Sequence, residues 1–523
     1  MRIRCTLGLL AVVAVAAAGC VSGTGSSSPA ASDVPVLQIP TDPGSLDPQA
    51  SVGAWGRPML RLAYDTLVAD GPNGTVVPQL AQSWTANATQ VTFKLKSGIT
   101  CADGEPFTAK TAAANFERMK DPAAKIPFTV SFLGSDTYQV SSDPTANTVT
   151  LKLPKPFSPL LSGLANYPGM ICQKGLDNPG ELRSKTFGTG PFVLTKSTAG
   201  TEYQFTTRKG YSWGPDGANT SVSGFPKGVT VKVVDNETTA ANLMLSGALD
   251  LGVFTTRGAY QRLTGSKFSQ QTVPASATYL HFNFLKPENP AQDIGVRRAL
   301  SETVDRAAMS KIATGSEKQT HNSVALPQAP CAKDISDQNL IQFDPQKAAQ
   351  DLASAGWVKH GSGWMKSGRE LRLNVLVTGS ASVGSKPIAD YVVNAWKQLG
   401  VPVSIEDVDQ ATGVERRAEN KYDVWVGAWT SVFNPAIIAP FLTPQNSANY
   451  GYIANKAYAA LAQQAFAMDP SKTCEVWAQA QNAINEQVSM VPLYYDATTY
   501  VTSKGLSLKP YRTWIAPTSM RVG

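Results

Sequence analysis

The chain has 523 residues, of which 42% are hydrophobic and 16% are charged, so it can build several domain cores but not long charged helices or coiled coils. Its formal charge of +7 falls to about +5 without Arg2 and Arg4 of the N-terminal segment, which excludes the dense basic surface of a nucleic-acid-binding protein. The three histidines argue against a histidine-rich metal enzyme, and we expect no metal or other cofactor.

The N-terminal residues have the pattern of an export signal. A positively charged start precedes an apolar stretch at 7–18, which is shorter than the about 20 helical residues needed to cross a bilayer. Small residues lead up to Cys20, as in the bacterial lipobox, although Ala17 stands where leucine is usual. We therefore predict a signal peptide over 1–20, lipidation of Cys20 and a flexible Ser/Gly/Ala-rich tether over 21–33. Ordinary secretion with cleavage nearby is the alternative.

The cysteines indicate disulfides. Export places the chain in an oxidising compartment, where an even number of cysteines favours pairing. The four that remain after Cys5 and Cys20 allow three pairings, and the absence of a C-x-x-C motif argues against zinc or redox sites. These four are Cys101, Cys172, Cys331 and Cys474.

Hydrophobic periodicity predicts a mixed chain of strands and helices. The order strand, helix, strand over 372–405 favours a parallel unit, and the whole pattern favours an α/β fold with more than one sheet. In chain order we predict a strand at 36–39, a helix at 59–68, a strand at 91–95, a helix at 108–119, strands at 148–153, 203–207 and 229–234, a helix at 238–246, a strand at 279–284, helices at 296–312 and 348–355, a strand at 372–377, a helix at 388–399, strands at 401–405 and 423–426, and helices at 456–467 and 475–488.

Catalytic motifs are missing from the sequence. There is no H-E-x-x-H and no G-x-S-x-G. Residues 379–386 fall short of a phosphate loop because Ser385 separates the second glycine from the lysine, and 188–190 lack the third glycine of a dinucleotide fingerprint. A carboxylate pair of the glycosidase type stays open, so a secreted hydrolase is the alternative from another functional class.

Several short blocks, in a fixed order from about residue 36 to 520, resemble bacterial extracellular solute-binding proteins of family 5. These are the dipeptide-, oligopeptide- and nickel-binding components of ABC importers. The blocks are 45–48 (SLDP), 64–67 (YDTL), 78–84 (PQLAQSW), 93–107 (FKLKSGITCADGEPF), 188–192 (GTGPF), 282–283, 296–300 (VRRAL) with 305–306, and 343–357 (FDP to AGW).

The resemblance implies an α/β fold of the periplasmic-binding-protein type, with two lobes, a hinge and an extra domain (cluster C, type II topology). By analogy, the first lobe comprises 34–60, 185–275 and 496–523, the extra domain 61–184, and the second lobe 276–495. Each disulfide would then lie within one domain, which favours Cys101–Cys172 and Cys331–Cys474.

The resemblance also implies a ligand site in the cleft between the lobes. The loop after the first strand (51–55) and the loop after the strand at 423–426 would face this cleft, and Lys386 lies near the place where dipeptide binders carry an arginine for the ligand carboxylate. Tryptophan suits such a site because it offers a broad apolar face and one N–H donor. The candidate ligand-binding residues are Gly53, Trp55, Lys386, Trp425, Trp429, Thr430, Val432 and Asn434.

One departure from the family pattern bears on the ligand. Peptide-binding relatives carry an aspartate for the ligand's amino group on or near the position of Val432. The histidine that nickel-binding relatives use near this loop is absent, and Ala436 and Ile437 occupy the region. We expect a non-enzymatic, monomeric lipoprotein on the extracytoplasmic face of the cell membrane. It would capture a short peptide or similar small solute by hinge closure and deliver it to an ABC permease, with a sugar, an aromatic compound or a siderophore-like molecule as the alternative ligand.

Overall fold

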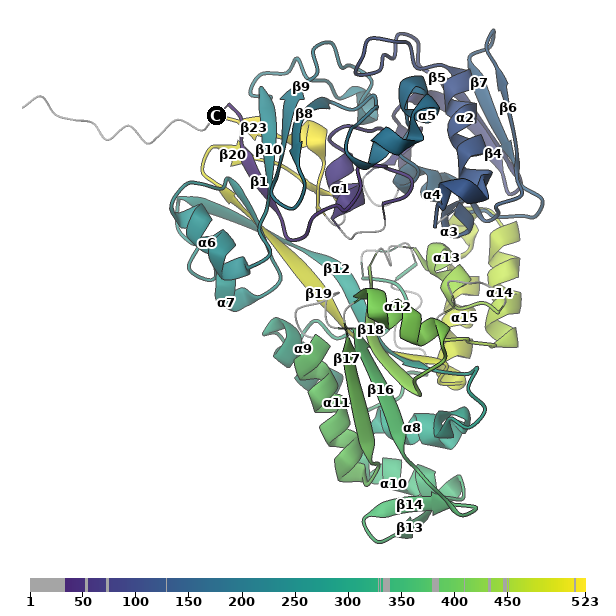
Figure 1. Cartoon of the computed structure of the whole chain (residues 1–523). Helices are drawn as coiled ribbons and strands as arrows, with labels where there is room; N and C mark the ends of the chain where they lie inside the picture. Colours follow the sequence, from purple (N-terminus) through teal and green to yellow (C-terminus); the bar gives the residue numbers. More distant parts are fainter. Residues whose placement is uncertain are drawn as a thin grey trace, which may run out of the picture.

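Ten strands form one continuous sheet that runs through the molecule (Figure 1). The computed structural model describes residues 33–51, 55–71, 75–127, 129–327, 329, 331–332, 339–378, 385–408, 410–430, 434–444, 449, 451–511 and 514–523. The strands lie in the order β17 (Val403–Val408), β16 (Leu373–Thr378), β18 (Val424–Thr430), β12 (Phe268–Phe282), β19 (Met490–Ser503), β11 (Leu251–Phe254), β1 (Val36–Ile39), β10 (Gly228–Val233), β9 (Glu202–Thr207) and β8 (Phe192–Thr198).

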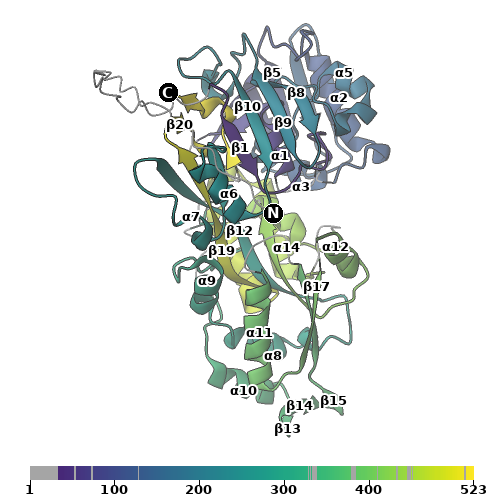
Figure 2. The ribbon, with the colours of Figure 1, turned by 60° about the vertical axis from the view of Figure 1, so that its left-hand side comes forward.

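Two long central strands, β12 and β19, connect the two halves of this sheet. They pair antiparallel along most of their length, and the register shifts at Pro274–Ser276 and at Thr278–Tyr279. We call the part built on β1 and β8 to β11 the first lobe and the part built on β16 to β18 the second lobe. Figure 2 shows β12 and β19 passing from one lobe to the other. The strand predicted at 279–284 is therefore only the end of a much longer one.

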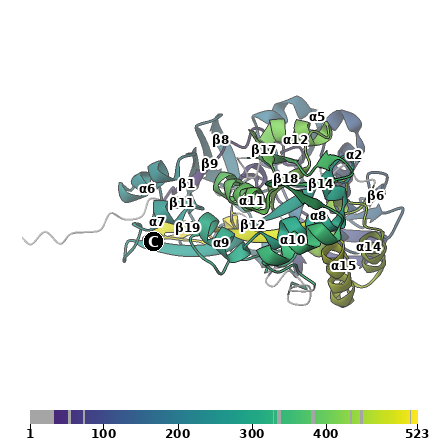
Figure 3. The same cartoon turned by 90° about the horizontal axis from the view of Figure 1, so that it is seen from below.

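The second lobe is built on the predicted parallel unit. β16 pairs in parallel with both β17 and β18, and α11 (Ser385–Leu399) makes the crossover, which confirms that prediction. The apolar stripe of α11, including Ile388, Val392 and Trp396, is fully buried against the sheet. Helices α8 (Ile294–Glu302), α10 (Pro345–Ser354) and α11 stand in front of these strands in Figure 3, with α14 (Lys456–Ala467) and α15 (Cys474–Glu486) to one side.

The helix predicted at 296–312 is two helices. α8 ends at Glu302, and α9 (Arg306–Thr314) starts anew because the Asp305 side chain accepts hydrogen bonds from the backbone N–H groups of Ala307 and Ala308. A carboxylate at this position satisfies the free donors of a helix start. The apolar periodicity continues through this break, and for that reason the sequence predicted a single helix at 296–312.

A separate four-stranded sheet, which we call the extra sheet, has the order β4 (Ala81–Asn87), β5 (Gln90–Leu95), β7 (Thr148–Lys152) and β6 (Gln139–Asp143). Alternation along β5 and β7 buries Val91, Phe93 and Leu151 on one face, against Phe116 of α2 (Ala109–Lys120). The other face is polar, as is common for antiparallel sheets with one solvated side.

The extra sheet's unit contacts the second lobe directly. The backbone N–H and the hydroxyl of Ser158 donate to the carbonyl oxygens of Phe466 (2.9 Å) and Ala465 (3.1 Å) in the last turn of α14. Beside them the rings of Phe157 and Phe466 lie 5.1 Å apart, and both side chains are buried. Ser158 thus caps the end of a helix that is about three hundred residues away in the chain.

The two predicted disulfides are confirmed. Cys101 pairs with Cys172 across 71 residues, and Cys331 pairs with Cys474 across 143 residues. The first joins the extra sheet's loops to the segment before α5 (Gln173–Asp177). The second anchors the segment after α9 to the start of α15.

The remaining elements are short. The helix predicted at 59–68 is the single turn α1 (Gly56–Leu60), after which the chain turns into a strand. The others are β2 (Val68–Asp70) with β3 (Val76–Pro78), β13 (Val358–His360) with β14 (Gly363–Lys366) and β15 (Arg369–Glu370), β20 (Leu506–Ser507) with β23 (Arg521–Val522), β21 (Pro510–Tyr511) with β22 (Trp514–Ile515), α3 (Thr129–Leu133), α4 (Leu160–Asn166), α6 (Glu237–Leu245), α7 (Arg257–Tyr260), α12 (Gln410–Ala418) and α13 (Pro435–Ile438).

Candidate functional site

The parallel strands of the second lobe place their carboxyl ends at one edge of the sheet. β16 ends at Thr378, β17 at Val408 and β18 at Thr430, and the helices α11, α12 and α13 begin shortly after them. Ligands of open α/β sheets bind at such an edge because loops and helix starts converge there. We call it the carboxyl edge of the second lobe.

Three candidate residues lie at or near this edge. Thr430 is the last residue of β18, and Lys386 is the second residue of α11. Asn434 precedes α13, and its side-chain oxygen accepts a hydrogen bond from the Ala436 N–H at 2.9 Å, so it caps that helix. Gly53, Val432 and Cys20 lie outside the described residues.

Trp425 and Trp429 share one face of β18, as the alternation predicts. Trp425 stands opposite His281 of β12, and Trp429 stands opposite Ala277. Gly427 between them leaves room for the Trp425 indole to lie along the strand, because a Cβ at Gly427 would come within 2.0 Å of that ring. Gly427, which has no side chain, therefore allows Trp425 to adopt this orientation.

Around these tryptophans lies an aromatic cluster, which we call the Trp–His cluster. The His281 ring stacks on Trp425 at a centroid distance of 4.3 Å and lies 4.7 Å from Trp429. Tyr279 lies 5.2 Å from Trp429, and its hydroxyl is 3.2 Å from Nε2 of His321. All five side chains are buried, with Trp425 2% and Trp429 8% exposed.

Two groups of the cluster have unusual polar surroundings. Trp425 donates its indole N–H to the Thr378 hydroxyl at 3.3 Å, whereas the buried Nε1 of Trp429 has no hydrogen-bond partner among the described residues. Both ring nitrogens of His281 also lack a partner of hydrogen-bonding geometry within that part of the chain. Buried polar groups of this kind are uncommon and call for a physical explanation.

Arg417 of α12 adds a positive charge to the cluster. Its guanidinium carbon lies 4.2 Å from the Trp425 ring centroid, and the side chain is buried. Burial lowers the pKa of His281 well below its usual value near 6.5, and the charge of Arg417 lowers it further, while the Gly427 backbone opposes the shift. Burial alone lowers the pKa of His321 to about 3, so both histidines are neutral at neutral pH.

Sequence reasoning missed Tyr279, His281 and Arg417. The first two were visible in the alternating strand YLHFNF, which places them on one face. Arg417 belongs to a charged stretch (ERRAENK) that reads as a solvated helix face, so its burial had no sequence signal. Trp55 is half-buried at the start of α1 and packs against the core of the first lobe, outside the Trp–His cluster.

No group of three or more metal-ligating side chains gathers within the described ranges, and no helix in them is long and apolar enough to span a bilayer.

A two-lobed sheet joined by long central strands, with its candidate site at a carboxyl edge, defines a periplasmic-binding-protein fold. Residues 75–450 match the model of the bacterial extracellular solute-binding proteins, family 5, middle region, and the chain belongs to this family. Members of the family are transport binding proteins, not enzymes.

Individual relatives cover most of the chain. The periplasmic murein peptide-binding protein MppA of Escherichia coli (strain K12) is 26% identical over 482 residues, which are 88% of this chain and 87% of MppA. The nickel-binding periplasmic protein of the same organism is 26% identical over 416 residues, 74% of each chain. A substrate-binding protein from Microbacterium hydrocarbonoxydans, complexed with 4-hydroxybenzoate hydrazide, has a TM-score of 0.79 and 26% identity, and the match covers 94% of this chain and all of that one.

Proposed function

We propose that this protein is the extracytoplasmic, lipid-anchored binding component of an ABC importer, and that it captures a short peptide or a similar small solute between its lobes. The observation that carries the proposal is the carboxyl edge of the second lobe, with its Trp–His cluster, in a chain of family 5. The match to a murein peptide-binding relative supports a peptide-like ligand.

The hinge belongs to this proposal. β12 and β19 pass through both lobes, and the register shift at Pro274–Ser276 coincides with the proposed lobe boundaries at 275/276 and 495/496. A bulge bends and twists a strand pair locally, which suits a pivot. The Ser158–Phe466 contact on the extra sheet's side would then be made when the lobes are together.

The loop after β18 has no acidic side chain that could pair with a positively charged group of the ligand. Residues 429–435 read WTSVFNP and contain no acidic residue. An ammonium buried in a closed cleft without a paired charge costs several kcal/mol. The ligand therefore presents no cation at this loop, and the protein binds blocked peptides at least as well as free ones.

Titration calorimetry with matched free and N-acetylated peptides tests the hypothesis that the ligand presents no cation at this loop. We expect equal or tighter binding of the acetylated member, with quenching or enhancement of tryptophan fluorescence and no product formed. A tenfold preference for the free amine, about 1.4 kcal/mol, would contradict it. Release of product would favour a secreted hydrolase instead.

A non-peptide aromatic solute is the second candidate. It is supported by the aromatic side chains near the carboxyl edge and by the relative from Microbacterium hydrocarbonoxydans, which is complexed with an aromatic hydrazide. Mass spectrometry of small molecules that co-purify with the protein separates the two candidates.

The lipid anchor is tested by Cys20→Ser. The tether at 21–33 has no apolar stretch of its own, so the variant should leave the membrane fraction. A variant that stays with membranes after a salt wash would contradict lipidation at Cys20.

A further inference from the structure

The parallel strands of the first lobe end on the side that faces the second lobe. β11 is antiparallel to β19, with Leu251 opposite Thr502 and Phe254 opposite Thr499, so it advances towards the end of β19 that lies in the second lobe. β1 is parallel to β11 and ends on the same side. β18 approaches the central strands from the second lobe, so the carboxyl edges of the two lobes face each other. The chain that follows β1 therefore leaves the first lobe where ligands of such sheets bind.

A buried ion pair from the extra sheet's unit holds this chain. Arg118, in the last turn of α2, lies 2.5 Å from Asp47 (Nη2 to Oδ2), and the two side chains are 13% and 8% exposed. Nη1 of Arg118 also donates to the side-chain oxygen of Gln49 at 2.7 Å. Asp47 in turn accepts hydrogen bonds from the backbone N–H groups of Gln49 (2.9 Å) and Ala50 (3.2 Å). One guanidinium therefore fixes both a carboxylate and the turn that this carboxylate organises.

Gln49 extends the network into the middle of α2. Its side chain is fully buried, and its Nε2 donates to Oδ1 of Asn115 at 2.8 Å. Asn115, also fully buried, donates to the carbonyl oxygen of Ile171 and accepts from the Ile171 N–H, both at 2.8 Å. We call Asp47, Gln49, Asn115 and Arg118 the Asp47 network. Buried polar groups that are hydrogen-bonded in this way specify one arrangement of the chain.

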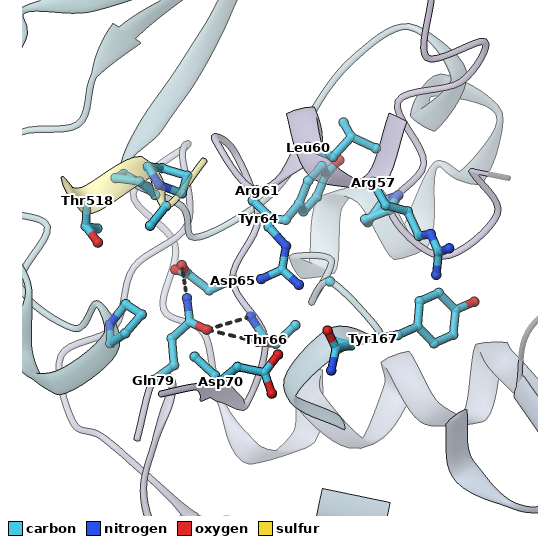
Figure 4. Close-up of a pocket in the computed structure, with 18 of the residues that line it drawn as sticks. Arg57, Leu60, Arg61, Tyr64, Asp65, Thr66, Asp70, Gln79, Tyr167 and Thr518 are labelled. Atoms are coloured by element: carbon cyan, nitrogen blue, oxygen red, sulfur yellow. Dashed lines mark hydrogen bonds between the residues drawn. The ribbon is translucent and has the colours of Figure 1, made fainter. Parts of the chain in front are cut away.

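A second segment of the extra sheet's unit contacts the same turn. The Tyr167 hydroxyl donates to the backbone carbonyl oxygen of Gln49. In Figure 4, which shows the neighbouring cavity, this hydroxyl points away from Asp65. Two residues further on, a Cβ at Gly169 would come within 2.8 Å of the Pro48 side chain, so the glycine lets this segment lie directly against the turn.

The turn determines where α1 begins. The backbone N–H of Ser51 donates to the carbonyl oxygen of Asp47 at 3.0 Å, and Ser51 is 2% exposed. A Cβ at Gly56 would come within 2.2 Å of the Ser51 hydroxyl oxygen, so these two residues pack directly together. Trp55 immediately precedes Gly56 and packs against the core of the first lobe. A displacement of Asp47 would therefore move Ser51 and the start of α1 as well.

We propose that Asp47 and Arg118 are positioning residues for solute capture, which hold the chain after β1 where it meets a solute bound at the carboxyl edge of the second lobe. The inference rests on the proposed function, because it requires the solute to lie between the lobes. It gives the extra sheet's unit a part in binding, since α2 sets the geometry of a first-lobe segment without contacting the solute. Loss of the guanidinium leaves the Asp47 carboxylate buried without its cation and releases the turn.

Fluorine NMR of the full chain labelled with 5-fluorotryptophan tests the positioning without a ligand. Trp55→Phe assigns the Trp55 signal, and Trp396, which is fully buried in the second lobe, is the internal reference. Arg118→Gln should shift or broaden the Trp55 signal and leave that of Trp396 in place. The control Lys286→Gln breaks a similarly buried ion pair with Asp423 at the other end of β18 and should leave the Trp55 signal unchanged. An unchanged Trp55 signal in Arg118→Gln would overturn the proposal.

Binding measurements separate positioning from a purely structural role. Each variant is titrated with the blocked tripeptide acetyl-trialanine, well below its melting temperature. We expect Arg118→Gln and Asp47→Asn to weaken binding at least tenfold, about 1.4 kcal/mol, and Lys286→Gln to leave it unchanged although it also lowers the melting temperature. A lower melting temperature with unchanged affinity in Arg118→Gln would show that the ion pair only stabilises the fold.

Failure of the proposed function has a different signature. A wild-type protein that does not bind acetyl-trialanine counts against the peptide ligand, and the fluorine spectra then decide alone whether Arg118 positions the chain. If Arg118→Gln does not fold, Arg118→Lys keeps a charge beside Asp47 but lacks the second donor group for Gln49. It should change the Trp55 signal and the affinity in the same direction and to a smaller extent. Wild-type behaviour of Arg118→Lys in both measurements would refute the assignment.

Discussion

Replacing His281 by phenylalanine should make the protein more stable. His281 is fully buried, and among the described residues its ring nitrogens make no hydrogen bond of good geometry, only a weaker polar contact with the Gly427 backbone. An unsatisfied buried polar group costs roughly 1–3 kcal/mol, and an apolar ring of similar size removes that cost while keeping the stack on Trp425. We therefore expect His281→Phe to raise the free energy of unfolding by about 1–3 kcal/mol at pH 7.

The same variant should change the acid dependence of stability. The pKa of His281 is lowered in the folded protein, so the unfolded chain takes up a proton below pH 6.5 while the folded one does not. Stability is therefore full above pH 6.5 and falls as the pH drops towards the folded pKa. Between pH 7 and pH 5 this single group accounts for a loss of about 2 kcal/mol, which the variant should not show.

Urea unfolding at pH 7, 6 and 5, followed by tryptophan fluorescence, measures both effects. His321→Phe is the matched control, because it also removes a buried neutral histidine but takes a hydrogen-bonding partner from the Tyr279 hydroxyl. His321→Phe should also reduce the loss of unfolding free energy between pH 7 and pH 5, but it should not raise the free energy of unfolding at pH 7. A His281→Phe protein that is less stable than the wild type at pH 7, or that keeps the full acid slope, would refute the reasoning.

Three further predictions concern stability and conformation. Replacing both cysteines of Cys101–Cys172, or of Cys331–Cys474, by serine should lower the free energy of unfolding by about 4 and 5 kcal/mol for the loops of 71 and 143 residues, and an unchanged urea midpoint would contradict this. Each carboxylate oxygen of Asp65 accepts hydrogen bonds from two buried donors, so Asp65→Asn would turn an N–H donor towards two of these four donors. We expect the free energy of unfolding to fall by about 3 kcal/mol or more, whereas the control Asp136→Asn on the surface should leave it unchanged. Ser158→Ala combined with Phe157→Ala should shift the unliganded protein towards an open form, seen as a larger radius of gyration in small-angle scattering, whereas Ser135→Ala should leave it unchanged.

Local patterns predicted the elements whose signals are local. The stripe of α11 and the alternation of β5 and β18 come from residues within a few positions of each other, and they are correct. The break between α8 and α9 was missed because Asp305 interrupts the helix without interrupting the apolar period. The length of β12 was missed because its first half is polar and pairs with a strand more than two hundred residues away.

The sequence named residues for a candidate site but not the side chains that surround them, and ligand binding by those residues stays a prediction. The family resemblance pointed to Thr430, Asn434 and Lys386, and the structure places these three positions at or near one carboxyl edge. Burial of Arg417 against Trp425 depends on how α12 packs over β16 and β18, which no single segment encodes.

The continuous ladder through β12 and β19 makes the two lobes one cooperative unit. Residues of β12 bond to β19 from Phe268 to His281, and β19 in turn bonds to β11 while β12 bonds to β18. If either lobe unfolded, the other lobe would lose strand pairing along β12 and β19, and the buried side chains of these strands would be exposed to water. Calorimetry should therefore record a single transition rather than one for each lobe, and amide protons of β12 and β19 should exchange only through global unfolding.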